Sequence, residues 1–258
     1  MDMNYSLLLV VVALVFFLLL LAAMQLGRLA RGRAPADSPG AAAIEASVFA
    51  LLGLLMAFTF SGAAQRMAER RDLLVQEVNA IGTAWLRVDL LDAADQPALR
   101  DQFRRYVDER INYYAHVTDL QGRDAIADQV SALQKALWSG SVQASRHTAP
   151  PLAAAYIGAV NEMFDVASAQ TVAQKVHPPA ATYAFLGFLA LICACLVGRH
   201  LASAQGRGLF HQLVYAVVMT TALYIIVDFE FPRLGVIRID QSDALLAAQR
   251  AAMTDPAP

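Results

Sequence analysis

Residues 54–71 read LLMAFTFSGAAQRMAERR, and this short stretch joins two kinds of sequence. Its first half is apolar enough to lie in lipid, whereas its second half carries Arg66, Arg70 and Arg71. The join contains no proline, and Gly62 is its one glycine. Because proline and glycine are the residues that most often end a helix, we expect one long helix that leaves the membrane and continues into water.

The composition places the chain among membrane proteins. Hydrophobic residues make up 57% of its 258 residues and charged residues only 16%, which is more apolar and less charged than a soluble domain. The formal net charge is -2, and the basic residues lie in small clusters at the ends of apolar segments. A nucleic-acid-binding protein presents a basic face, so we exclude nucleic acid as a partner.

Four segments are long and apolar enough to span a bilayer. The first carries no charged side chain, and at about 1.5 Å per residue such a helix crosses the roughly 30 Å hydrocarbon core. A signal peptide is the alternative interpretation of this segment, but no lysine or arginine precedes it. The predicted spans are residues 6–26, 42–64, 181–201 and 209–227.

The segment between the second and third spans is too polar for lipid and long enough for a domain. Its apolar residues recur at helical spacing, without the sustained alternation of strands. We therefore predict an all-α fold with four transmembrane helices and a soluble helical bundle, inserted between spans 2 and 3 and continuous with span 2. The predicted divisions are residues 1–64 for spans 1 and 2, 65–180 for the bundle, 181–231 for spans 3 and 4, and 232–258 for a C-terminal tail.

The helices of the predicted bundle have recognisable boundaries. The first continues span 2 and presents an apolar seam that consists of Met67, Leu74, Val78, Ile81, Trp85 and Val88. The other expected boundaries are a helix start at Asp95 and Pro97, a turn at Gln121 and Gly122, a break at residues 147–151 and a hinge at residues 177–179.

The positive charges leave the orientation of the chain open. Arg28, Arg31 and Arg33 follow span 1, which by the positive-inside rule places that loop in the cytoplasm and the bundle outside. Arginines after spans 2 and 4 nearly balance this count. Long domains cross membranes with little regard to charge, so we lean to the outside placement on the loops alone.

Span 2 has two distinct faces. Small residues at alternating four-residue and three-residue spacing form a stripe that lets another helix approach closely: Ala46, Ala50, Gly53, Ala57, Ser61, Ala64 and Ala68. A different face carries Glu45, Phe49, Leu52, Met56 and Phe60. In one interpretation the stripe packs inside one subunit and the bulky face meets lipid. In the other, several copies of the bulky face line a pore, with rings of apolar side chains that gate by dewetting.

Charged residues flank these predicted spans. Glu45 favours the pore interpretation, because an ionisable side chain in a span usually faces a cavity or a partner. Arg66, Arg70 and Arg71 would then provide charge at the mouth of the pore. At the end of span 4, Asp228, Glu230 and Arg233 form a predicted interfacial cluster, either an ion pair that fixes the depth of the helix or a group that attracts cations.

Two segments resemble the signature sequences of bacterial membrane proteins described as bestrophin-like. They are FALLGLLMAFTFSGAAQRMAERRDLLVQEVNAIGTAWLRVDLL, residues 49–91, and YIIVDFEFPRLGVIRID, residues 224–240. The second departs from the pattern, since Phe231 and Leu234 stand where basic residues are common, which weakens a role for a basic cluster there. The resemblance implies a multi-pass protein of the bacterial inner membrane, with the lipid bilayer as its surroundings.

A more distant similarity to true bestrophins, which are pentameric anion channels, implies more. It implies self-association into a closed ring, a pentamer by analogy, with small inorganic ions as the transported species. In those channels the second span lines a hydrophobic neck and passes into a cytosolic helical domain. In this sequence, only the face that contains Phe49, Met56 and Phe60 can correspond to that neck. A cytosolic bundle contradicts the charge-based orientation, so one of the two inferences must be wrong.

Other chemistries find little support in the sequence. The five histidines are scattered without the spacing of metal ligands, and no glycine-rich phosphate loop or nucleophile motif occurs. We therefore expect no metal, no cofactor and no enzymatic activity. The leading hypothesis is a homo-oligomeric bestrophin-like ion channel with span 2 lining the pore. The sign of the ion stays open, because Glu45 and Asp228 favour cations whereas the arginines and the bestrophin analogy favour anions. The alternative is a membrane-anchored helical sensor or scaffold with no transport activity.

Overall fold

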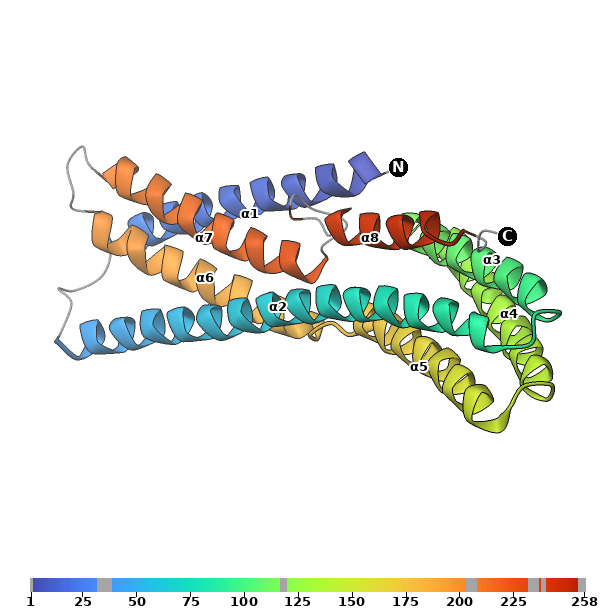
Figure 1. The fold of residues 1–258 in the computed structure, drawn as a ribbon. Coiled ribbons are helices and arrows are strands. Elements are labelled where there is room, and N and C mark those ends of the chain that lie inside the picture. Colours follow the sequence, from blue (N-terminus) through green and yellow to red (C-terminus); the bar gives the residue numbers. More distant parts are fainter. Residues whose placement is uncertain are drawn as a thin grey trace. The chain divides into compact units, whose positions relative to one another are not determined.

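The computed structural model describes residues 2–31, 39–116, 120–202, 208–231, 237 and 240–254 (Figure 1). Within these residues the chain forms helices and short turns and contains no strand, so the all-α prediction is confirmed. The helices are α1 (Asp2–Arg31), α2 (Pro39–Arg87), the 3-10 helix η1 (Val88–Leu90), α3 (Gln96–Ala115), α4 (Leu120–Ser145), α5 (Pro150–Lys175), α6 (Ala180–Leu201), α7 (Gly208–Glu230) and α8 (Asp240–Ala251).

Helix α2 is the longest element of the chain. It runs for 49 residues without interruption, through Gly62 and the three arginines that follow (Figure 1). At about 1.5 Å per residue its length is roughly 70 Å, more than twice the hydrocarbon thickness of a bilayer. The predicted continuity of this helix is confirmed.

Among the residues that the structure describes, four helical stretches are long and apolar enough to cross a membrane. They lie within Ser6–Ala30, Gly40–Leu90, Pro150–Leu201 and Gly208–Glu230. Each of the four spans expected from the sequence falls inside one of these stretches. The chain is therefore a membrane protein with four candidate spanning helices.

The chain divides into two compact units, and the first contains residues 1–67 and 177–237. In unit 1, α1 packs against α6 and α7, and α6 also contacts α7. Side chains from these helices and from the first part of α2 form one apolar cluster, whose buried members are Leu20, Met24, Leu52, Leu189, Ala190, Cys193, Ala194 and Ala216.

Two glycines allow α1 and α6 to approach at backbone distance. A Cβ atom added to Gly27 would lie 1.9 Å from the carbonyl oxygen of Cys195, and one added to Gly198 would lie 2.0 Å from the carbonyl oxygen of Met24. Neither position therefore accepts a side chain while the helices keep their places. Helices in lipid associate through such close contacts, because lipid tails are as apolar as the side chains and provide no hydrophobic driving force for association.

The second unit contains residues 68–176 and 238–258. Here α3 packs against α4 and α8, and α4 packs against α5. The seam predicted on the second half of α2 is confirmed, because Leu74, Ile81 and Val88 are fully buried in the core of this unit. Helix α8 also contributes to that core through Leu246, a contribution that the predicted C-terminal tail did not anticipate.

The boundaries between helices agree with the sequence in three places and differ in one. Helix α3 begins at Gln96, with Asp95 before it and Pro97 in its first turn, as predicted. Helix α5 begins at Pro150, where proline suits the first turn, and the chain is non-helical between α5 and α6 at residues 176–179. The predicted turn at Gln121 and Gly122 is wrong, because α4 already begins at Leu120. A single glycine costs a helix only about 1 kcal/mol, so Gly122 did not end it.

Candidate functional site

The bulky face of α2 packs inside unit 1. Leu52 is 1% exposed and belongs to the apolar cluster, and Phe49 and Met56 pack against that cluster while partly buried. A side chain enclosed by its own chain has no free surface to offer a pore. Leu52 therefore has no free surface for the predicted pore-lining role, whereas that role stays a prediction for Phe49, Met56 and Phe60.

The small-residue stripe of α2 lies on the opposite side. Ala46, Ala50, Gly53, Ala57 and Ser61 are exposed in the single chain, and Ala64 is half-buried. A Cβ atom added to Gly53 would meet nothing within 4 Å among the described residues. The interpretation in which this stripe packs within one subunit is therefore wrong, and the stripe is open to a partner.

Large apolar side chains adjoin the stripe on the exposed side of α2. Leu51, Leu54 and Phe58 are 45%, 52% and 67% exposed. Phe60 lies at the other edge, 43% exposed, with its ring centroid 5.5 Å from that of Phe229 on α7. Of the five side chains predicted to line a pore, Phe60 is thus the one with a large exposed surface.

Glu45 has a partner within unit 1. Its Oε2 atom lies 2.5 Å from Nε2 of His200, at the last turn of α6. The carboxylate is largely buried, whereas the histidine is half exposed. The expectation that an ionisable group in a span faces a partner is met by a residue that sequence reasoning had set aside as a scattered histidine.

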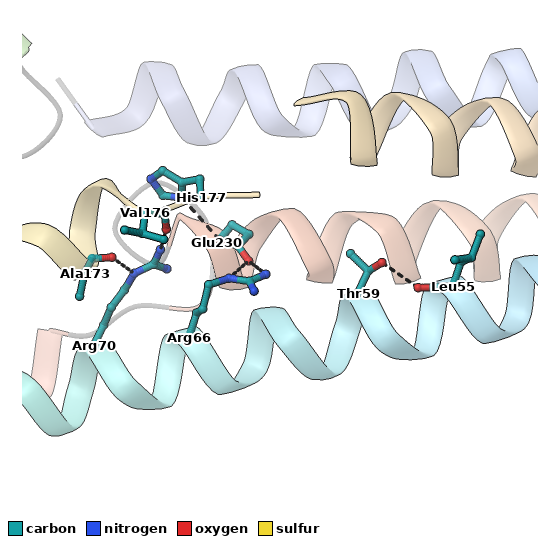
Figure 2. Close-up of polar contacts among 8 residues, drawn as sticks. All are labelled: Leu55, Thr59, Arg66, Arg70, Ala173, Val176, His177 and Glu230. Carbon is teal, nitrogen blue, oxygen red and sulfur yellow. Dashed lines mark hydrogen bonds and ion pairs between the residues drawn. The ribbon is translucent and has the colours of Figure 1, made fainter. Parts of the chain in front are cut away.

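Glu230, a buried acid at the end of α7, connects the predicted interfacial cluster to Arg66 of the predicted pore mouth. The carboxylate of Glu230 is fully buried and accepts hydrogen bonds on Oε1 from Nε of Arg66, at 2.7 Å, and from Nη2 of the same guanidinium (Figure 2). His177 Nδ1 lies 3.5 Å from the other oxygen, and its ring stacks on Phe231 at 4.7 Å. Arg66, assigned from the sequence to a pore mouth, is therefore the ion-pair partner of Glu230.

The other members of the predicted interfacial cluster have different positions. Asp228 is buried and accepts a hydrogen bond on Oδ2 from the backbone N–H of Ile237, at 3.0 Å. Arg233, which was expected to pair with one of the acids, lies outside the described residues. The cluster as described thus ties the end of α7 to α2 and to the chain that follows.

The side chains of the three arginines after span 2 differ in their contacts and exposure. Arg70 is 4% exposed and donates to the carbonyl oxygens of Ala173 and Val176, each at 3.0 Å (Figure 2). These carbonyls belong to the C-terminal end of α5, where no helical N–H remains to pair with them. Arg66 pairs with Glu230, as described above, and Arg71 is exposed. Of the three, only Arg71 is exposed.

A buried polar network in unit 2 was not predicted. Glu77 is fully buried and Arg110 is 3% exposed, and Nε of Arg110 donates to Oε1 of Glu77 at 2.7 Å. The Tyr114 hydroxyl donates to Oε2 of Glu77 at 2.5 Å and accepts from Nη2 of Arg110 at 2.7 Å. Burial works against the charged guanidinium, but the Tyr114 hydroxyl and the Glu77 carboxylate hold the pKa of Arg110 above its ordinary value.

Glu77 and Arg110 carried a weak signal in the sequence. Each lies on the buried side of a helix whose neighbouring turns are apolar, Leu74 and Ile81 around Glu77, and Tyr106 and Tyr114 around Arg110. A charged residue at such a position must find a partner of opposite charge. Among the described residues, no group of three or more metal-ligating side chains occurs.

Comparison with known proteins identifies a family and solved structures that are similar to this chain. A family model described as Bestrophin-like domain matches residues 7–244. The crystal structure of a bacterial bestrophin homolog from Klebsiella pneumoniae is similar, with a TM-score of 0.69 at 13% identity over 95% of this chain and 98% of that one. A variant of that homolog gives 0.65 at 13% identity, over 93% and 97%. No curated protein matches the sequence. At these identities, the solved structures establish the fold.

Proposed function

Because the chain belongs to the bestrophin-like family, we propose that it forms a homo-oligomeric ion channel in the bacterial inner membrane. The family match covers most of the chain, and the fold agrees with that of the Klebsiella pneumoniae homolog. By analogy with true bestrophins, the assembly is a closed ring of five copies. Small inorganic ions are the species that such a ring would pass.

One observation carries the proposed position of the pore. Helix α2 leaves a continuous face exposed along its apolar half, with the small-residue stripe beside Leu51, Leu54 and Phe58. Small residues allow identical helices to approach closely around an axis. Apolar side chains beside them can form a constriction that gates by dewetting. We therefore assign the pore to the side of α2 opposite Leu52, and Leu54 and Phe58 to its hydrophobic neck.

The proposed arrangement places unit 2 in water, as a helical bundle continuous with α2. Unit 2 has an apolar core of its own, which is what a domain inserted between spans requires. The family resemblance puts this bundle in the cytoplasm, and we adopt that orientation over the weaker argument from loop charges. A reporter enzyme that is active only in the periplasm can be inserted after His147, which is exposed in the turn between α4 and α5. We expect it to be inactive in this orientation, and full activity would show that the bundle lies outside the cytoplasm.

We propose that the channel conducts anions. Of the two acids that argued for cations, Glu45 has His200 as a partner, and Asp228 is buried and accepts a hydrogen bond from the backbone N–H of Ile237. Arg71 remains exposed on α2 just beyond the apolar half. Reversal potentials in asymmetric potassium chloride distinguish the two signs, since an anion channel follows the chloride gradient and a cation channel follows the potassium gradient.

The test of channel function uses the purified chain in liposomes and in detergent. We expect ion flux from the liposomes and a native mass that corresponds to a closed ring. A monomer or dimer that gives no flux at any voltage, calcium concentration or pH would contradict the proposal and favour the sensor or scaffold alternative.

Matched substitutions decide which face of α2 lines the pore. Leu54→Ala and Phe58→Ala widen the proposed neck, so we expect each to raise the single-channel conductance about two-fold or more. Phe49→Ala and Met56→Ala remove similar volumes from the face that packs inside unit 1 and are expected to leave the conductance of folded channels unchanged. If Phe49→Ala and Met56→Ala changed the conductance and the other two did not, the pore would be lined by the bulky face instead.

A further inference from the structure

A pocket of about 290 Å³ lies between α3, α4 and α5 of unit 2. Four of the side chains that line it are buried and form its floor, namely Arg110, Tyr113, Val130 and Ala167. Ser168 and Val172 are exposed and mark its mouth. The volume is at the small end of the range for ligand-binding pockets, roughly 300 to 1,000 Å³, so an occupant must be a small molecule.

The pocket contains the positive end of a buried ion pair, whose acid lies outside the lining. Arg110 is the one charged residue among the described residues that line the pocket, and its partner Glu77 does not line it. Glu77 engages Nε and the Tyr114 hydroxyl engages Nη2, whereas Nη1 makes no hydrogen bond to any described residue. This nitrogen is not fully buried, so a ligand oxygen in the pocket can reach it.

The rest of the lining indicates what kind of molecule carries that oxygen. The side chains of Ser131 and Ser168 add hydroxyl groups, while Val130 and Ala167 add an apolar floor. The Thr171 hydroxyl donates to the Ala167 carbonyl oxygen instead. A planar carboxylate matches the geometry of a guanidinium better than a spherical ion does. An apolar floor favours a carbon body over a hydrated inorganic anion.

We propose that this pocket binds a small organic carboxylate, whose carboxylate group contacts Arg110 and whose short carbon body lies on Val130 and Ala167. The site is independent of the proposed pore. Because Arg110 also holds Glu77, the bound carboxylate would share one guanidinium with a buried residue of α2.

The test measures binding to the full chain in a neutral detergent by calorimetry at pH 7. Butyrate is the probe, and butyramide is its neutral match of nearly the same shape. We expect butyrate to bind at least tenfold more tightly than butyramide. Equal affinities would overturn the proposal, as would displacement of butyrate by an equal concentration of chloride, which would indicate a site for simple halides.

Two substitutions locate the binding without touching the buried network. Ser168→Trp places a large side chain at the exposed mouth of the pocket and is expected to weaken butyrate binding at least tenfold. Ser139→Trp makes the same change at an exposed position of α4 that does not line the pocket, and should bind as the unchanged protein does. Equal binding by both variants would overturn the assignment. So would a change of native mass in Ser168→Trp, which would identify the mouth as a contact between subunits.

Discussion

Unit 1 brings two of its helices together at their backbones and has its buried acids, Glu45 and Glu230, near the ends of helices, whereas unit 2 encloses charged and hydroxyl side chains in the middle of its core. In unit 1, Gly27 and Gly198 remove the side chains that would keep α1 and α6 apart. In unit 2, Glu77 and Arg110 lie within a core that also contains aromatic rings. In the proposed arrangement, with unit 1 in lipid and unit 2 in water, the surroundings of each unit explain this difference. Lipid offers no hydrophobic gain for association, so contact must be close, whereas burial from water tolerates a paired charge.

The largest expected effect comes from breaking the close contact of unit 1. Gly198→Leu puts a Cβ atom where the backbone of Met24 already lies, and backbone atoms cannot move aside as a flexible side chain can. We expect a loss of more than about 5 kcal/mol of the free energy of unfolding, which belongs to the severe end of single substitutions. Gel filtration in detergent should then give no monodisperse protein.

Gly158→Ala is the matched control for that substitution. A Cβ atom at Gly158 would meet nothing within 4 Å among the described residues, and alanine favours a helix by up to about 1 kcal/mol. This variant should behave as the unchanged protein or be slightly more stable. A monodisperse, stable Gly198→Leu variant would contradict the account of unit 1.

The next effect tests the enclosed charge of unit 2. Glu77→Ala leaves Arg110 buried without its carboxylate, and breaking a buried pair in this way typically costs about 3 to 5 kcal/mol. Thermal unfolding in detergent measures the loss. The double variant Glu77→Leu with Arg110→Met should recover most of it, because apolar residues of similar size replace a buried pair at little cost. A double variant as unstable as Glu77→Ala would show that the charges themselves are required.

A third prediction concerns alkaline pH. Burial of the Tyr106 hydroxyl raises its pKa from 10.0 to about 12. Below pH 10 the hydroxyl keeps its proton whether the chain is folded or not, so its effect on stability is then constant. Between pH 10 and 12 the unfolded chain loses the proton first, and the free energy of unfolding falls by about 2 to 3 kcal/mol. Tyr106→Phe should lose correspondingly less stability over that range, and equal losses in both proteins would contradict the prediction.

The smallest expected effect comes from a charge pair at the surface of unit 2. Arg250 on α8 donates from Nε and Nη2 to the carboxylate of Asp108, at 2.7 and 3.0 Å. The carboxylate is 54% exposed, and exposed pairs contribute at most about 1 kcal/mol. Arg250→Gln should therefore change the midpoint of thermal unfolding very little. A loss as large as that of Glu77→Ala would mean that exposure does not distinguish the two pairs.

The burial of side chains on α2 shows which features could not be predicted from the sequence. The two faces of its membrane half were identified from spacing alone, but spacing did not show that Leu52 is buried inside unit 1. Spacing says that Leu52 and Ala50 lie on different sides of a helix, and it says nothing about where α1 and α6 lie. Leu52 is buried because those helices contribute Leu20 and Leu189 to its surroundings. The orientation of a helix about its own axis depends on its neighbours.

The sequence by itself determined the class of the protein, its four apolar helices, the unbroken course of α2 and the buried seam in the second half of that helix. Each of these depends on local patterns, which a run of adjacent residues specifies. Only the tertiary structure decided which face of α2 is open, that Arg66 meets Glu230 and that Gly27 and Gly198 bring two helices into contact. Arg66 and Glu230 are 164 residues apart in the chain. Contacts of that kind depend on how whole helices pack, which no local pattern encodes.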